Sequence, residues 1–268
     1  SAFPFTSHIV AYFLKKRGNF PWITDYGDPW ALISANSLDY LIEKKIVCKS
    51  TKIIVTTEET KKGYLSMYPT LVDDQVIVIP QGYDEERYNR IKPVKFEKPT
   101  VVFTGNLSYS ARDPKKFFDA LKKIDEINCI ITGAPSVDII TYVKKLGIEN
   151  KVNFTGVLPL EDVIALQKGA TILLCFGWGG GYQIPGKVFE YMAAKRPILY
   201  IAYEKDAGAR IVEEYKLGLV VNNEARSISK AIQKILSKDH RIDFKSSDFF
   251  SWRNHAKKLS KVIDEISY

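Results

Sequence analysis

A stretch with four glycines in five positions constrains this chain more than any other feature. Residues 177–181 read G-W-G-G-G, and they follow an apolar run at 172–176 that predicts a buried strand. Pro185 and Gly186 end the loop, and the spacing of apolar residues predicts a helix over 187–194. A strand, a glycine loop and a helix in this order present free backbone N–H groups to an anion.

Two charged side chains stand at the start of that helix. Lys187 falls in the first turn, where a cation is unfavourable against the helix dipole, and Glu190 follows three residues later on the same face. A bound phosphate would offset the cost of the lysine, and a carboxylate suits a sugar hydroxyl. The pair therefore indicates a site for a diphosphate joined to a sugar. The alternative is a glycine-rich loop beside a solvated lysine and glutamate.

The composition is that of an ordinary globular protein. The 268 residues are 46% hydrophobic and 26% charged, which fits one large or two modest domains. No apolar run approaches the roughly 20 residues of a membrane span. The three cysteines are far apart, so we expect reduced thiols, a cytoplasmic location and no metal site. The net charge of +8 suits an anionic small molecule or an anionic membrane surface, but no basic run interleaved with aromatic residues indicates nucleic acid.

Strands alternate with helices along the chain, which predicts an α/β fold with parallel sheets. The first domain, residues 1–92, contains only about three expected strands, at 21–24, 52–55 and 75–79. Its helices are expected at 8–16, capped by Ser7, and at 31–47 and 58–67. Such a sheet would expose an unpaired edge. We therefore expect a preceding segment, a partner chain or self-association to cover it.

The second domain, residues 93–250, has enough strands for a complete doubly wound sheet. A charged, proline-containing stretch at 85–98 precedes it and is expected to be a linker. The last residues, 251–268, form a helix that we expect to pack back toward the first domain. The six expected strands lie at 100–104, 127–132, 152–155, 172–176, 198–202 and 219–221.

Ligands of open parallel sheets bind outside the carboxyl ends of the strands. Four loops there carry glycine or charge: 105–113, 133–136, 156–158 and 177–186. Arg112 is the best second anion ligand, because a guanidinium pairs with two phosphate oxygens at once; the alternative is a surface charge. Asp25 and Asp28 are candidate cleft carboxylates, although Asp28 also fits an ordinary turn. No nucleophile elbow, P-loop or dinucleotide fingerprint is present, which argues against a serine hydrolase, an ATPase and a dehydrogenase.

Four stretches together resemble retaining, nucleotide-sugar-dependent glycosyltransferases of the GT-B fold, the large family four group. P-G-K-V-F-E-Y-M-A-A-K-R-P-I-L at 185–199 is similar to the family's donor-binding helix. F-T-G-N-L-S-Y-S-A-R-D-P-K-K-F-F-D-A-L at 103–121 is similar to its first glycine loop. I-P-Q-G-Y-D at 79–84 resembles the end of the N-terminal domain, and residues 7–16 together with residues 21–30 resemble its middle. The resemblance spans the whole chain and implies two Rossmann-like domains, the first incomplete and the second complete.

The resemblance also implies roles for individual residues. Lys187 and Arg112 would hold the diphosphate, Glu190 would bind the ribose, and His8 would face the transferred sugar. His8, Arg112 and Lys187 are therefore the candidate catalytic residues; a lone histidine is otherwise more often structural. The remaining candidate donor-binding residues are Gly105, Asn106, Gly133, Val157, Gly180, Gly181, Tyr182 and Gln183. Two departures concern the donor sugar: Tyr182 stands where the family often has a second glutamate, and Gly27 where related sequences often have arginine.

The mechanism that the resemblance implies needs no protein nucleophile, no bound metal and no cofactor. The acceptor hydroxyl attacks from the face of the leaving diphosphate, with retention of configuration. The expected acceptor is a glycan or a lipid-linked molecule, and the expected location is cytoplasmic, at the inner membrane face. Two alternatives remain: a non-catalytic nucleotide-sugar-binding subunit of a split enzyme, and a GT-B sugar-nucleotide epimerase.

Overall fold

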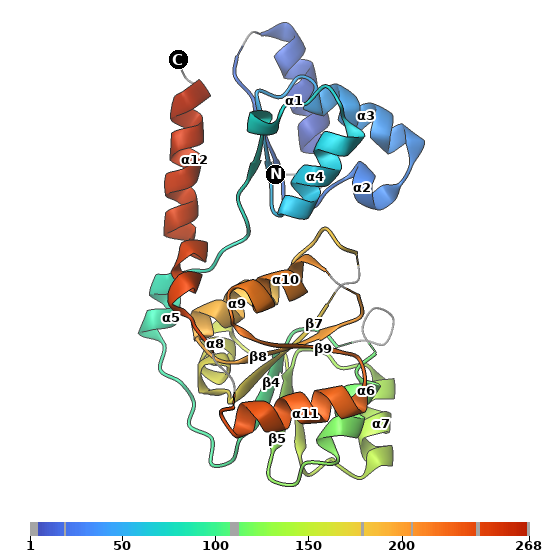
Figure 1. The fold of residues 1–268 in the computed structure, drawn as a ribbon, viewed down its shortest axis with the longest axis vertical. Helices are drawn as coiled ribbons and strands as arrows, with labels where there is room; N and C mark the ends of the chain where they lie inside the picture. Colours follow the sequence, from blue (N-terminus) through green and yellow to red (C-terminus); the bar gives the residue numbers. More distant parts are fainter. Residues whose placement is uncertain are drawn as a thin grey trace. The chain divides into compact units, whose positions relative to one another are not determined.

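A computed structural model describes residues 5–18, 20–107, 113–177, 180–204, 206–239 and 242–266 (Figure 1). The chain divides into two units, each built around a parallel sheet. The first unit comprises residues 1–82, 180–184 and 250–268, and the second comprises 83–179 and 185–249. The chain passes from one unit to the other after residues 82, 179, 184 and 249.

The second unit contains a six-stranded, wholly parallel sheet in the order β6-β5-β4-β7-β8-β9. Its strands are β4 (Thr100–Thr104), β5 (Asn128–Thr132), β6 (Val152–Gly156), β7 (Ile172–Phe176), β8 (Ile198–Ala202) and β9 (Gly218–Asn222). Its helices are α5 (Glu85–Arg90), α6 (Lys115–Leu121), α7 (Val137–Leu146), α8 (Leu160–Gly169), α9 (Gly186–Ala194), α10 (Ala207–Glu214) and α11 (Ala225–Leu236). A 3₁₀ helix (Lys245–Phe250) follows them.

Helices cover both faces of this sheet. Figure 1 shows α8, α9 and α10 on one side of the strands and α6, α7 and α11 on the other. Every residue of β4, β7 and β8 is buried, which is why these strands appear in the sequence as continuous apolar runs. The expected six strands of the second domain are all confirmed in number and order along the chain.

The sheet has its topological switch point between β4 and β7. The chain leaves β4 toward β5 and leaves β7 toward β8, in opposite directions. The β4–β7 ladder pairs Val101 with Ile172 and Val102 with Leu173. Two residues further along, the Thr104 N–H donates to the hydroxyl of buried Tyr191 at 3.2 Å. A side chain of α9 thus satisfies the backbone at the carboxyl end of β4, where open α/β sheets bind ligands.

The first unit has a three-stranded parallel sheet in the order β1-β2-β3. The core around Tyr26, Ile53 and Val55 also includes buried side chains of α3 and α4 and half-buried ones of α1. Within the described part of the chain, β1 pairs with a strand on one side only. The strands are β1 (Ile23–Tyr26), β2 (Lys52–Val55) and β3 (Val76–Val78), the helices α1 (Thr6–Arg17), α2 (Ala31–Ser34), α3 (Ser37–Val47), α4 (Glu58–Met67) and α12 (Trp252–Ile266), and a 3₁₀ turn spans Asp73–Gln75.

Several local predictions for residues 1–98 are wrong, and the strand expected at 21–24 is β1 at Ile23–Tyr26. The helix expected over 31–47 is two helices, because Ala35 adopts a left-handed conformation at φ 48° and Asn36 caps α3 by accepting from the Leu38 N–H at 2.9 Å. The first helix begins at Thr6 rather than after Ser7, and Phe5 precedes it without a side-chain cap. The stretch expected to be a linker contains α5.

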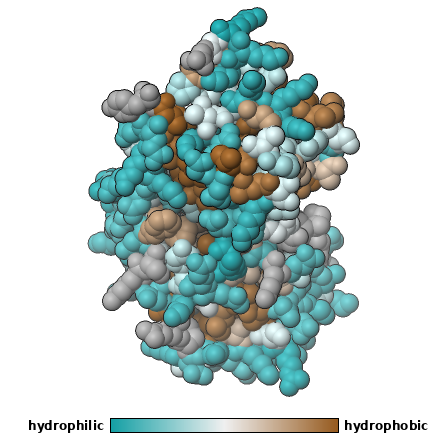
Figure 2. Space-filling model, turned by 45° about the horizontal axis from the view of Figure 1, so that its top comes forward, coloured by the Kyte–Doolittle hydropathy of each residue, from teal (hydrophilic) through white to brown (hydrophobic). Residues whose placement is uncertain are grey.

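Hydrophilic residues cover most of the molecular face in Figure 2, and hydrophobic residues form several separate patches there. This distribution agrees with a chain that is 26% charged. Some apolar side chains of α1 are exposed, among them Val10, Phe13 and Leu14. No described helix is long and apolar enough to cross a membrane.

A buried carboxylate holds three elements of the first unit together. Glu43 on α3 is fully buried, and it accepts hydrogen bonds from the hydroxyl of Tyr64 at 2.5 Å and from that of Tyr68 at 2.7 Å. It also accepts from the N–H of Ala31 at 2.9 Å, at the start of α2. Burial raises the pKa of the Glu43 carboxyl. A charge in this position is tolerated because each oxygen has a donor.

We expect replacement of Glu43 by alanine to lower the free energy of unfolding by about 3–5 kcal/mol. The change leaves two phenol groups and one backbone N–H buried without their acceptor, and each such loss costs about 1–3 kcal/mol. Urea denaturation measures the difference. Lys45→Ala, an exposed change on the same helix, is the matched control and should cost less than about 1 kcal/mol. A similar small effect for both variants would contradict the assignment.

Candidate active site

An ion pair joins the first turn of α9 to the second. Lys187 Nζ lies 3.0 Å from Oε1 and 2.8 Å from Oε2 of Glu190, and the two side chains are 32% and 35% exposed. The sequence predicted that these residues share one face of a helix, and the geometry confirms it. An ion pair of this exposure contributes at most about 1 kcal/mol to stability, and a cation at a helix N-terminus is unfavourable. The pair is therefore available for exchange with a ligand.

Two glycine loops pack closely against each other, and the first of them lies beside Lys187. Gly105 follows β4 with φ 137°, and Gly133 follows β5 with φ 101°. A Cβ on Gly133 would lie 2.4 Å from the carbonyl oxygen of Gly105, so no larger residue fits there. A Cβ on Gly105 would lie 3.6 Å from Lys187 Cε. The lysine stem therefore passes over the first glycine loop.

Hydrogen bonds connect the loops after β4 and β5 and the last residue of β6. Asn106 Oδ1 accepts from the Ala134 N–H at 3.3 Å, and the Gly133 N–H donates to the Gly156 carbonyl at 2.8 Å. Val157, directly after β6, is 83% exposed. The structure thus brings five predicted residues together in the second unit: Gly105, Asn106, Gly133, Lys187 and Glu190. Val157 lies at the end of the neighbouring strand, and Arg112 lies outside the described residues.

The glycine-rich loop after β7 continues into residues that group with the first unit. Residues 180–184 belong to that unit, where Thr57 Oγ1 donates to the Tyr182 carbonyl at 2.7 Å. The Gln183 side-chain amide donates to the Asp28 carboxylate. Gly181 has a positive φ of 74°, and Gly180 has open space around its Cα. Gly180, Gly181, Tyr182, Gln183 and Asp28 are therefore neighbours in the first unit.

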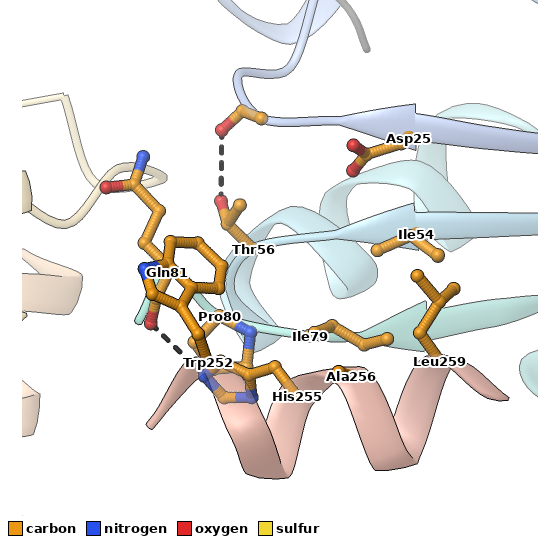
Figure 3. A pocket seen from close by; sticks show the side chains of 11 residues that line it. Asp25, Ile54, Thr56, Ile79, Pro80, Gln81, Trp252, His255, Ala256 and Leu259 are labelled. Atoms are coloured by element: carbon orange, nitrogen blue, oxygen red, sulfur yellow. Dashed lines mark hydrogen bonds between the residues drawn. The ribbon is translucent and has the colours of Figure 1, made fainter. Parts of the chain in front are cut away.

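Asp25 lines an apolar cavity of about 460 Å³ in the first unit. Figure 3 shows this carboxylate at the end of β1, with Ile54 of β2 and residues of α12 lining the same space. His255 on α12, which the sequence did not single out, is buried here, with Nε2 3.3 Å from the Gln81 carbonyl oxygen. The sequence did not indicate that His255 would be buried, because the residue lies in a charged, helical stretch. Trp252 lines the cavity from the same helix.

His8 is a neutral, buried imidazole. The side chain is 3% exposed, and its ring lies 4.6 Å from the ring of Tyr26. Its Nε2 has no hydrogen-bond partner among the described residues. Burial lowers the pKa of His8 to about 4, so the ring carries no charge at neutral pH. No group of three or more metal-ligating side chains gathers anywhere in the described residues.

The family described as glycosyl transferases group 1 matches residues 98–238, which is more than half of the chain. The chain belongs to this family. The matched region contains the Gly105–Gly133 loops, Lys187 and Glu190, so the ion pair lies within the part of the chain that defines a group 1 glycosyltransferase. No curated protein matches the chain.

Solved glycosyltransferase structures share the fold. Sucrose-phosphate synthase from Thermosynechococcus elongatus is 18% identical with a TM-score of 0.74; the match covers 97% of this chain and 71% of that one. Anabaena HepE in complex with UDP is 13% identical with a TM-score of 0.77, covering 97% and 76%. WaaG, a glycosyltransferase of lipopolysaccharide biosynthesis, is 16% identical with a TM-score of 0.63, covering 92% and 75%.

These findings confirm the predicted fold class. The chain is an α/β protein of the GT-B type, with parallel sheets of three and six strands. It is an enzyme of the glycosyltransferase class.

We expect His8 to make stability depend on pH. The unfolded chain binds a proton near the ordinary pKa of 6.5, whereas the folded chain binds it only near 4. Between these values the unfolded state holds more protons, so acidification lowers the free energy of unfolding, by about 3 kcal/mol at most. His8→Gln removes this contribution, so its difference in unfolding free energy from wild type should depend on pH.

Urea denaturation at pH 7, 6 and 5 measures that difference. The advantage of wild type over His8→Gln should shrink as the pH falls. His255, whose pKa burial also lowers, is present in both proteins and cancels in the comparison. A difference that stays constant across this range would contradict the account of His8.

Proposed function

We propose that this glycosyltransferase moves a sugar from a nucleotide-diphosphate sugar to a glycan or lipid-linked acceptor, with retention of configuration as in family four. The observation that carries the proposal is the position of the Lys187–Glu190 pair. Lys187 stands in the first turn of α9, over the Gly105 loop and next to the topological switch point of the sheet, and Glu190 lies one turn later. Binding at a switch point is general for open α/β sheets.

Each part of the donor has a matching group in the second unit. The Lys187 ammonium and the free N–H groups at the start of α9 suit the diphosphate, and Arg112 is proposed as a further cation. The Glu190 carboxylate can accept hydrogen bonds from two ribose hydroxyls. Gly105 and Gly133 present bare backbone to the ligand, and Val157 is exposed where a base would lie. In two solved HepE structures the bound molecules are UDP and UDP-glucose, which supports a donor of this class.

The chemical step is proposed to need neither a metal nor a protein nucleophile. As the bond to the transferred hexose breaks, negative charge grows on the leaving diphosphate. Lys187 and the α9 N–H groups stabilise that charge in place, which is the largest catalytic contribution that such a site can supply. The acceptor hydroxyl approaches from the same face and loses its proton to the departing phosphate, so that configuration is retained.

Residues of the first unit are proposed to serve the sugar and the acceptor. His8 is neutral, so its imidazole can exchange hydrogen bonds with sugar hydroxyls without adding charge. Asp25 and Asp28 are both exposed carboxylates that can accept such bonds. The Gly180–Gln183 backbone is proposed to meet the donor sugar.

A cytoplasmic location with peripheral attachment to an anionic membrane is part of the proposal. Val10, Phe13 and Leu14 are exposed on α1, and Lys15 and Lys16 follow in its last turn. Exposed apolar side chains next to cations suit an anionic lipid surface. The net charge of +8 acts in the same direction. We also propose that another strand, from a partner chain or a second copy, covers the free side of β1.

Calorimetric titration with UDP, GDP and ADP tests the donor site. We expect one nucleotide to bind saturably, and Lys187→Ala and Glu190→Ala each to weaken it at least about tenfold, or about 1.4 kcal/mol. Lys98→Ala is the control: it also removes the cation of an ion pair, to Glu126 at 3.0 Å, but precedes β4 and so lies at the opposite end of the sheet. Equal losses for all three variants, or no binding by folded wild type, would refute the site.

A further inference from the structure

Gln167 is a fully buried polar side chain whose amide group contacts the Lys187–Glu190 pair. It lies on α8 with 0% exposure, although glutamine is mostly found on protein surfaces. Its Nε2 donates to Glu190 Oε2 at 3.0 Å and to Thr104 Oγ1 at 2.9 Å. Its Oε1 accepts from the Tyr88 hydroxyl at 2.6 Å. Both N–H groups and the oxygen of the amide therefore have partners.

The partners fix which way the amide points. An ionised carboxylate only accepts hydrogen bonds, so the amide nitrogen must face Glu190. The reversed amide would place its oxygen against the carboxylate oxygens, and two acceptors would repel each other. Burial raises the pKa of the Tyr88 phenol, which keeps it a hydrogen-bond donor to the other end of the amide. Tyr88 and Glu190 together therefore select a single orientation.

Tyr88 is itself held firmly in place. It lies on α5, and its side chain is 6% exposed. The next residue of α8 after Gln167 is Lys168, whose Nζ donates to the backbone carbonyl of Tyr88 at 2.6 Å and to that of Ile91. Two adjacent residues of α8 thus hold α5 in place. Lys168 bonds only backbone carbonyls. Gln167 bonds the Tyr88 side chain and also the Glu190 carboxylate.

We infer that Gln167, oriented by Tyr88, is a positioning residue that holds the Glu190 carboxylate for the ribose hydroxyls; this inference rests on the proposed donor site. In the ligand-free protein Lys187 contacts both carboxylate oxygens. When Lys187 turns to a diphosphate, the carboxylate loses that partner. Gln167 keeps its hydrogen bond to Oε2, which fixes the rotamer of Glu190 and leaves Oε1 for the nucleotide.

The test compares UDP with 2′,3′-dideoxy-UDP, which lacks both ribose hydroxyls; if wild type binds GDP or ADP instead, the dideoxy form of that nucleotide is used. Gln167→Met keeps the length of the side chain and removes every hydrogen bond. We expect it to weaken UDP about fivefold or more and to leave dideoxy-UDP within about twofold, because a charge-assisted hydrogen bond is lost only where the ribose hydroxyls are present. Tyr88→Phe, which removes one hydroxyl, should act in the same direction with a smaller effect.

Two controls separate positioning from general damage to the fold. Lys168→Met removes the hydrogen bonds to the carbonyls of Tyr88 and Ile91 but leaves the Gln167–Glu190 contact. It should change the affinity for UDP and for dideoxy-UDP by no more than about twofold. In a Glu190→Ala background, Gln167→Met should have no further effect on UDP. Circular dichroism checks that each variant folds.

Each outcome decides between positioning and bulk stability. A loss by Gln167→Met that is equal for UDP and dideoxy-UDP would show a merely structural residue and overturn the inference. No loss by Gln167→Met or Tyr88→Phe, with Glu190→Ala still impaired, would overturn it and leave the proposed function intact. Failure of wild type to bind any of the three nucleotides would overturn the proposed function and this inference with it.

Discussion

The candidate site depends on how the sheet of the second unit ends at its switch point. Parallel strands bring all their carboxyl ends to one edge, and β4 and β7 are neighbours from which the chain departs in opposite directions. At the end of β4, the Tyr191 hydroxyl takes the Thr104 N–H, and the Thr104 hydroxyl takes an N–H of Gln167. Side chains of α8 and α9 thus anchor the strand directly before the first glycine of the site.

Burial on both faces of the six-stranded sheet holds the backbone of the site rigid. The Lys187–Glu190 ion pair is partly exposed and can be displaced by a ligand. Every residue of β4, β7 and β8 is buried, as are most residues of α9, so this close packing holds the backbone N–H groups in place without a ligand. Lys187 and Glu190, each about one third exposed, are held by each other and by one amide. Preorganised donors beside a displaceable internal ion pair suit the capture of a diphosphate.

Sequence patterns predicted the elements better than the contacts between them. The runs at 100–104, 172–176 and 198–202 are strands at those bounds because two-sided burial requires continuous apolar residues. The proximity of Lys187 and Glu190 was predicted correctly, because residues three apart on a helix lie on the same face. Ala35 was missed because nothing in its type signals a left-handed conformation, and Gln167 was missed because one glutamine in a helix forms no pattern. Its importance comes from Tyr88, which is far away in the sequence. The grouping of residues 180–184 with the first unit likewise depends on contacts with Thr57 that spacing cannot show.

A crystal structure of the chain with UDP would show whether Lys187 and Glu190 bind the donor. We expect diphosphate oxygens within hydrogen-bond distance of Lys187 Nζ, ribose hydroxyls at the Glu190 carboxylate, and loss of the 2.8 Å contact between those two side chains. We also expect the Gly105 and Gly133 loops to keep their conformations. UDP bound elsewhere, with the Lys187–Glu190 pair unchanged, would contradict the proposed donor site.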